Sequence, residues 1–98
     1  MFMIIGQMTM AKEAMGSYAE DVQSLIDEVV REDGCQYYSL AVQDEKAGLI
    51  SVTEIWSDEN ALNVHLKQPW VQAFNKKYMS HLKSHTLKIY DGDYVRDF

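Results

Sequence analysis

The spacing of apolar residues predicts a strand at the start of the chain and a helix after it. Residues 2–10 are mostly apolar without strict alternation, which is typical of a strand covered on both faces. After them, apolar residues recur every three or four positions, which is the spacing of one helical face. They are Met15, Tyr18, Ala19, Val22, Leu25, Ile26, Val29 and Val30. Gly34 is the expected end of this helix, because glycine readily adopts the left-handed conformation that closes helices.

The next segment predicts a hairpin followed by a broken helix and a last strand. Residues 35–43 and 49–56 are the two predicted hairpin strands, joined by the polar loop 44–48. Ser57 is the predicted N-cap of a short helix with an inward stripe of Ala61, Leu62, His65 and Leu66. Pro69 begins another helix, because proline is favoured in a first turn. One side of that helix carries Trp70, Ala73, Phe74, Tyr78, His81 and Leu82, and residues 86–90 form the final strand.

This order of elements predicts the fold class. Strand, helix, strand, strand, broken helix and strand fold as an α+β, ferredoxin-like βαββαβ domain, with both helices on one face of a four-stranded antiparallel sheet. We expect residues 1–98 to form a single domain. The other sheet face carries too many apolar residues to face water, so we predict a homodimer formed sheet to sheet. The tail beyond Gly92 is expected to add to the partner's sheet.

Composition narrows the classes of partner. The net charge of −6 disfavours nucleic acid, because an acidic domain offers phosphates no broad basic face. A single cysteine excludes a disulfide framework and fits a reducing cytoplasm, where we expect the protein. The longest apolar run, residues 1–5, is far shorter than the roughly 18 residues of a membrane span. We therefore expect neither a nucleic-acid nor a membrane partner.

Several short motifs stand in a characteristic order between Glu32 and Phe74. The chain reads E-D-G-C-Q-Y-Y-S-L and then L-I-S-V-T-E-I-W-S-D-E-N-A-L-N-V-H-L-K-Q-P-W-V-Q-A-F. This resembles the antibiotic biosynthesis monooxygenase domain, with its Gly-Cys-x-x-Tyr strand, Glu-x-Trp strand end, Ala-Leu-x-x-His helix and following Phe. The matching residues are Gly34, Cys35, Tyr38, Glu54, Trp56, Ala61, Leu62, His65 and Phe74.

The resemblance implies a dimeric α/β barrel with a pocket between sheet and helices in each subunit. Relatives oxygenate quinols, anthrones and related polyphenols with dioxygen and use neither flavin nor metal, so no cofactor is expected. One branch degrades haem instead, and other members do neither. That branch places a Trp where this chain has His65 and an iron-ligating His where it has Asn75, which disfavours haem degradation here. Trp70 stands where the family often has a second His.

The candidate chemistry centres on one histidine. A deprotonated phenol gives an electron to dioxygen readily, so the protein needs a base, a dry pocket and correct placement of the ring. His65 is the predicted catalytic base, because imidazole changes charge close to neutral pH. The predicted substrate-binding residues divide into flat walls and orienting groups. Trp56, Trp70, Phe74 and Tyr78 are the walls, and Tyr38 and Glu54 orient the substrate hydroxyl or the imidazole.

Each candidate also has a structural interpretation, which the sequence leaves open. His65 is equally interpretable as a hydrogen-bonded helix residue, the aromatic residues as core, and Glu54 as a paired structural carboxylate. His81 and His85 have the spacing of metal ligands on a helix but no third ligand at a supporting offset, and Cys35 reads as a small buried hydrophobe. Two other functions stay open: a non-catalytic dimeric domain that binds or senses an aromatic ligand, and an isomerase or decarboxylase in which His65 moves a proton.

Overall fold

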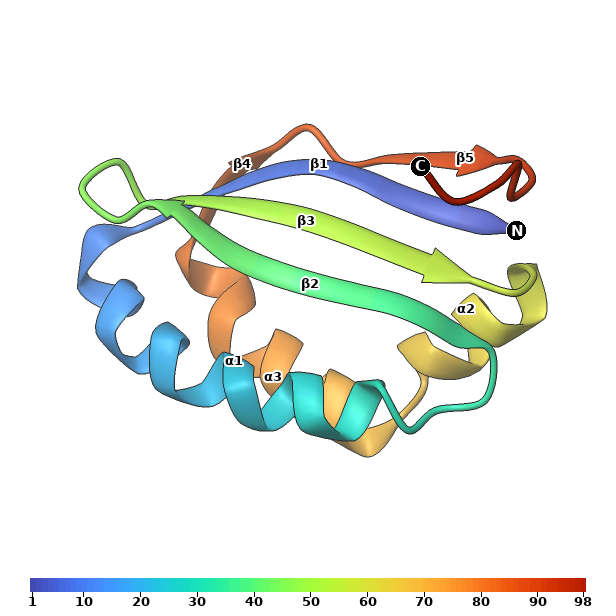
Figure 1. Cartoon of the computed structure of the whole chain (residues 1–98). Coiled ribbons are helices and arrows are strands. Elements are labelled where there is room, and N and C mark those ends of the chain that lie inside the picture. The colour runs from blue at the N-terminus through green and yellow to red at the C-terminus, as the bar shows by residue number, and fades with distance from the viewer.

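A computed structural model describes all residues, 1–98, as one antiparallel sheet with three helices on one of its faces (Figure 1). The strands are β1 (Phe2–Met10), β2 (Cys35–Asp44), β3 (Leu49–Trp56), β4 (Leu82–His85) and β5 (Lys88–Asp91). The helices are α1 (Met15–Val29), α2 (Glu59–Leu66) and α3 (Pro69–Tyr78), with short 3₁₀ turns at Lys12–Ala14 and Met79–His81. None of the helices is long and apolar enough to cross a membrane.

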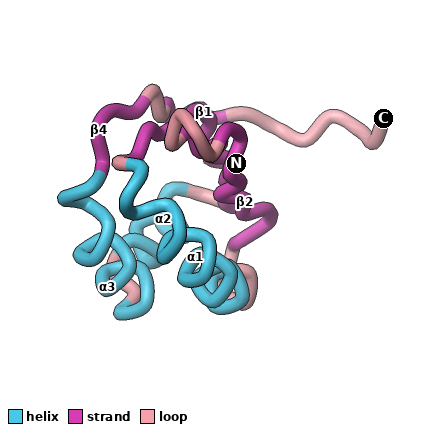
Figure 2. The backbone as a smooth tube through the Cα atoms, turned by 90° about the vertical axis from the view of Figure 1, so that its left-hand side faces the viewer, coloured by secondary structure: helices cyan, strands magenta, loops and turns pink.

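The sheet has the order β2-β3-β1-β4, and β5 also pairs with β1. All of its strand pairs are antiparallel. The view along the layers in Figure 2 shows the helices together on one side of the sheet. The α+β, ferredoxin-like prediction is therefore confirmed, with five strands in place of the four expected.

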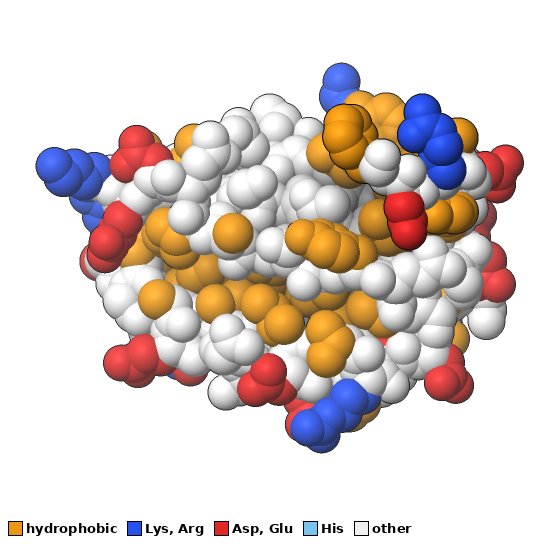
Figure 3. All heavy atoms as spheres, viewed as in Figure 1, with side chains coloured by type: hydrophobic (Ala, Val, Ile, Leu, Met, Phe, Trp, Pro, Cys, Tyr) orange, Lys and Arg blue, Asp and Glu red, His pale blue; other side chains and the backbone are white.

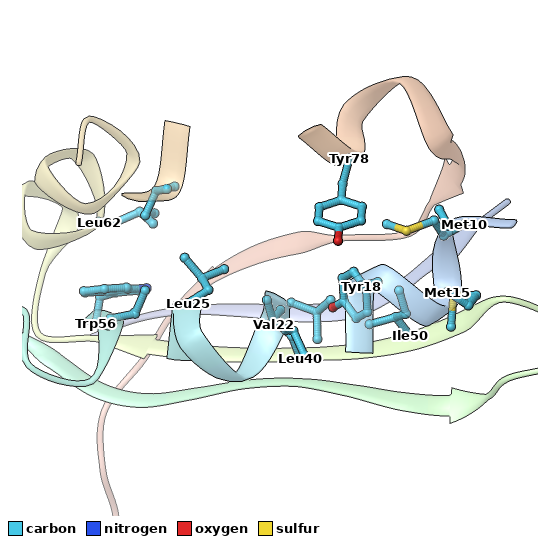
Figure 4. Packing of buried hydrophobic residues seen from close by; sticks show 14 residues of the cluster. Met10, Met15, Tyr18, Val22, Leu25, Leu40, Ile50, Trp56, Leu62 and Tyr78 are labelled. Carbon is cyan, nitrogen blue, oxygen red and sulfur yellow. The ribbon is translucent and has the colours of Figure 1, made fainter. Parts of the chain in front are cut away.

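The core lies between the sheet and the helices, and β3 is its central strand. The residues of β3 that face the helices are buried, while the alternate residues on the other face are only partly buried. From α1, five side chains close the core from the helix side, at the three-and-four spacing that the sequence predicts. These are Met15, Tyr18, Val22, Leu25 and Val29. Figure 4 shows how this cluster extends from Trp56 and Leu62 at one end to Met10 and Met15 at the other.

Several details of the predicted helices are wrong. α1 ends at Val29 and not at Gly34, and Ala19 and Val30 of its predicted stripe are exposed. Asp58, not Ser57, caps α2, since its carboxylate accepts a hydrogen bond of 2.8 Å from the amide of Ala61. Leu66, which the sequence places in the inward stripe, is 49% exposed. The helix that begins at Pro69 ends at Tyr78, so the predicted stripe loses its last two members, and Ala73 is exposed.

The final strand, predicted at residues 86–90, also differs: β4 precedes it, β5 covers its second part, and Thr86 and Leu87 lie between the two strands. Between them the amide of Thr86 donates to the carbonyl of Gln7, and the Thr86 hydroxyl accepts from the amide of Gln7. This segment comes so close to β1 that a Cβ at Gly6 would lie 2.5 Å from the Thr86 carbonyl oxygen. Glycine at position 6 therefore permits the bend that breaks one long strand into two short ones.

The sheet face opposite the helices carries an apolar row across four strands. Ile55 of β3 lies opposite both Tyr37 of β2 and Met3 of β1, and Met3 lies opposite Tyr90 of β5. Cross-strand partners share a face, so these four side chains are neighbours. Tyr37 and Tyr90 are 53% and 48% exposed. We call these four residues the open-face row.

The margins of the remaining surface are charged. In Figure 3 acidic and basic side chains lie around the visible face, while apolar side chains gather in a band over the junction of β2 and α1. The tail after Gly92 leaves the body of the molecule in an extended course (Figure 2). Its apolar residues are exposed: Tyr94, Val95 and Phe98.

Candidate active site

The centre of the site is the imidazole of His65, which α2 carries into the space between the layers. The residue is only 2% exposed. Its ring packs against the Trp56 indole with a centroid distance of 4.4 Å, and the Tyr38 ring meets it edge-on at 5.4 Å. Two aromatic side chains therefore fix the plane of the imidazole and shield it from bulk water.

One ring nitrogen of His65 is bound by Glu32, which lies in the turn between α1 and β2. The Nδ1 atom lies 3.1 Å from each oxygen of the Glu32 carboxylate. Trp70 of α3 donates its indole N–H to the same carboxylate over 2.9 Å. A carboxylate that accepts these bonds requires the proton of His65 on Nδ1, which leaves the lone pair on Nε2. The side chain of Glu32 is 7% exposed.

The other ring nitrogen faces a second carboxylate. Nε2 lies 3.9 Å from Glu54 Oε1, which is too long for a direct hydrogen bond. The same oxygen accepts a bond of 3.0 Å from the indole N–H of Trp56. Burial raises the pKa of Glu54, and this effect outweighs the opposing influences of the Trp56 hydrogen bond and the nearby imidazole. One imidazole is thus held between two carboxylates in different surroundings.

His65 and Glu54 both line a cavity of about 140 Å³ between the sheet and the helices. Most of its wall is apolar, with His65, Glu54, Tyr38 and Asn75 as the residues that carry polar side-chain groups. The other lining residues are Met8, Leu25, Leu40, Val52, Leu66, Val71, Phe74 and Leu87. An apolar cavity of about this size accommodates a single aromatic ring, as a cavity of about 150 Å³ accommodates benzene.

Two uncharged groups of the site, the Tyr38 hydroxyl and the Cys35 thiol, lose their protons less readily than usual. Burial, and then the neighbouring Glu54 carboxylate, raise the pKa of the Tyr38 hydroxyl above its usual range. Burial and the carboxylates of Glu32 and Glu54 also raise the pKa of the Cys35 thiol, whose side chain is partly buried against the core. Both groups therefore stay neutral near neutral pH. The imidazole is the only basic side chain in this cluster.

The structure brings together four of the predicted site residues in one cavity: Tyr38, Glu54, His65 and Phe74. Trp56 lies against the imidazole and outside the cavity lining. Trp70 reaches the site only through its hydrogen bond to Glu32. Tyr78 lies at a smaller cavity of about 60 Å³, where its hydroxyl donates to Asp21 over 2.6 Å.

Glu32 is the functional candidate that the sequence interpretation did not single out. It stands in the turn after α1, where no helical or strand periodicity assigns a direction to a side chain. Its only signal is that it opens the motif E-D-G-C, two residues before Gly34. Gly34 has a φ of +83°, and its carbonyl accepts a bond of 2.8 Å from the amide of Ser57. This turn therefore lies against the start of α2, which brings Glu32 to His65.

The interpretation of His81 and His85 as residues on one helix face is wrong. His81 ends the 3₁₀ turn after α3, and His85 ends β4. No group of three or more His, Cys, Asp or Glu side chains is arranged to hold a metal ion.

Fold and site together define the class of protein: a ferredoxin-like α+β protein with one buried imidazole beside a small apolar cavity. The sequence profile described as antibiotic biosynthesis monooxygenase matches residues 1–77. The chain belongs to the antibiotic biosynthesis monooxygenase family, which supports a general monooxygenase-like function.

Solved structures agree with this fold. A conserved protein from Methanosarcina mazei Go1 is 22% identical with a TM-score of 0.81, covering 94% of this chain and 92% of its own. A structure named antibiotic biosynthesis monooxygenase is 22% identical with a TM-score of 0.83, and the match covers 95% of this chain and 99% of that one. A Mycobacterium tuberculosis protein is 16% identical with a TM-score of 0.82, covering 98% of each chain. No curated protein matches the sequence.

Proposed function

We propose that the protein is a cofactor-independent monooxygenase that oxidises a small quinol or similar phenol with dioxygen, and that His65 is its catalytic base. The observation that carries the proposal is the orientation of the imidazole. Nδ1 is bound by Glu32, so the free Nε2 is the nitrogen that can take a proton from a ligand hydroxyl in the cavity. Family membership supports the same type of chemistry.

The cavity sets the size and chemistry of the proposed substrate. Its apolar wall fits one flat ring, with Phe74 on the side of α3 and Val52 on the side of the sheet. The polar residues Tyr38 and Glu54 lie on the lining with His65, and a phenolic hydroxyl placed among them faces the base. Tyr38 remains a hydrogen-bond donor, because its raised pKa keeps the hydroxyl protonated.

The proposed reaction needs no external reductant. His65 removes a hydroxyl proton, and the quinolate passes one electron to dioxygen to give a semiquinone and superoxide. These recombine to form a C–O bond on the ring, and the resulting hydroperoxide loses water. One oxygen atom enters the product as a hydroxyquinone, the other leaves in water, and the quinol supplies all the electrons.

The test is dioxygen uptake by the purified protein with a panel of quinols, corrected for autoxidation. We expect uptake above background, and a loss of roughly 100-fold or more in kcat in His65→Ala, the scale of general-base catalysis. His81→Ala is the matched control, because that histidine lies outside the cavity lining. No excess uptake across the panel, or an unchanged rate in His65→Ala, would overturn the proposal. Binding seen by thermal shift without uptake would support the ligand-binding alternative.

We also propose that two copies associate through the sheet face that the helices leave uncovered. The open-face row places Tyr37, Ile55, Met3 and Tyr90 side by side where a single chain leaves them in contact with water. Burying such a row stabilises an interface through the hydrophobic effect. Sedimentation velocity should show a dimer at micromolar concentration, and Tyr37→Lys should shift it toward monomer. A stable wild-type monomer would contradict the proposal.

A further inference from the structure

The Glu32 carboxylate occupies a boundary between the interior and the surface. On its inner side it binds Nδ1 of His65, which lines the cavity. On its outer side it lines an open surface hollow of about 280 Å³. The other residues of that hollow are Glu28, Arg31, Asp33, Val64, Gln68 and Trp70. No residue lines both spaces, and the hydrogen bond between His65 and Glu32 joins a residue of the cavity to a residue of the hollow.

We propose that Glu32 is the positioning residue of the site and the relay that connects the buried imidazole with solvent in the surface hollow. The first role follows from its hydrogen bonds. Oε2 accepts from both His65 Nδ1 and Trp70 Nε1, at 3.1 and 2.9 Å, so the carboxylate fixes the ring orientation and keeps the Nε2 lone pair toward the cavity.

The relay role rests on the proposed function and moves one proton at each stage. When Nε2 takes the substrate's hydroxyl proton, the Nδ1 proton passes to Glu32, and the imidazole ends neutral with its proton on Nε2. Glu32 then releases its proton to water in the hollow. When the hydroperoxide loses water, the proton on Nε2 is delivered to the leaving oxygen, and Glu32 returns a proton from solvent to Nδ1. The site ends each turnover in its starting state.

Other titratable groups surround this pair on the neighbouring elements. Glu54 of β3 and Tyr38 of β2 face the imidazole, and the Cys35 thiol lies near both carboxylates. Glu28, Arg31 and Asp33 line the hollow outside Glu32. Glu54 provides no second route, because it lies beyond hydrogen-bond distance of Nε2 and does not line the hollow.

Glu32→Gln separates the two roles. Its amide oxygen can still accept from His65 and Trp70 in place of Oε2, but it cannot take up a proton. We expect ¹⁵N NMR to show the Nδ1–H form of His65 retained, solvent exchange of that proton slowed at least about 10-fold, and kcat lowered about 10- to 100-fold with KM little changed. Asp33→Asn is the matched control: it removes a carboxylate from the same hollow without touching the imidazole.

The outcomes distinguish this inference from the proposed function. In Glu32→Leu, His65 should no longer prefer the Nδ1–H tautomer. If the folded variant keeps this tautomer, the positioning role is overturned. Exchange at the wild-type rate in Glu32→Gln would overturn the relay, whether or not the protein turns over quinols. Wild-type protein without dioxygen uptake would overturn the proposed function alone, because the NMR measurements require no substrate.

Discussion

The two ends of the space between sheet and helices are built differently, although one strand lines both. At one end, Ile50 of β3 packs against the apolar cluster of Met10, Met15 and Tyr18 (Figure 4). Four and six residues later, the same face of β3 presents Glu54 and Trp56 to His65. The first end is mainly hydrocarbon with a small cavity of about 60 Å³ beside Met10 and Tyr18. The second end holds two carboxylates, an imidazole and the larger cavity of about 140 Å³.

The two ends therefore contribute differently to the free energy of unfolding. Burying apolar side chains stabilises the fold, whereas a buried carboxylate with a raised pKa opposes it at neutral pH. Local departures from good packing are expected where a protein binds or reacts. We therefore expect the loss of apolar contacts at the first end to lower the free energy of unfolding, and the loss of the Glu54 charge at the second end to raise it.

The largest effect should come from Ile50→Ala at the packed end. Ile50 is fully buried, so the change removes apolar contacts and leaves a cavity, which costs about 2–5 kcal/mol. Urea denaturation measures this cost. Val64→Ala, at an exposed position of α2, should change stability by less than about 0.5 kcal/mol. A cost below about 1 kcal/mol for Ile50→Ala would show that this end is not closely packed.

At the cavity end, Glu54→Gln should stabilise the protein in a pH-dependent way. Because the pKa of Glu54 is raised by folding, the folded state holds this proton more tightly than the unfolded chain. The free energy of unfolding therefore falls as pH rises from about 4.5, the ordinary value, through the higher folded pKa. Glu54→Gln should be more stable than wild type at pH 8, with the difference shrinking toward pH 4.

Urea denaturation across this pH range measures the effect. The amide of the variant can still accept the hydrogen bond from Trp56, so the comparison isolates the carboxyl proton. Glu45→Gln, in the exposed loop between β2 and β3, is the matched control. A stability difference that does not vary with pH would show that folding does not raise the pKa of Glu54.

The smallest effect should come from Tyr18→Phe, within the packed end. The Tyr18 hydroxyl is buried and has no hydrogen-bond partner. Removing an unsatisfied buried hydroxyl relieves its desolvation cost, so we expect a gain of about 1 kcal/mol in thermal or urea denaturation. Tyr78→Phe provides the contrast, because it loses a hydrogen bond to Asp21 and should not stabilise. A loss of stability in Tyr18→Phe would reveal a partner for this hydroxyl.

Much of the fold was predictable, because its periodic signals are strong. β1, β3 and the start of α3 lie where the apolar pattern and Pro69 place them. The division of the last strand was not predictable from residues 82–91 alone. It depends on the close approach of Thr86 to Gly6, a contact between segments 80 residues apart in the chain.

The site was predictable where side chains belong to regular elements. Alternation along β3 places Glu54 with Trp56, and helical spacing turns His65 inward. Leu66 lines the cavity but is 49% exposed, because it is the last residue of α2. Glu32 was not predicted as a site residue, because a turn has no periodicity. The direction of its side chain is set by the contact between that turn and the start of α2.

The turn at Gly34 carries a consequence for how this protein tolerates sequence change. Any side chain there would adopt an unfavourable backbone conformation, and its Cβ would lie 2.6 Å from the Ala61 Cβ and from the Ser57 hydroxyl. Adding one methyl group at residue 34 would force α2 away from the neighbouring turn. The hydrogen bond that orients a histidine 31 positions downstream thus depends on a residue without a side chain at this turn.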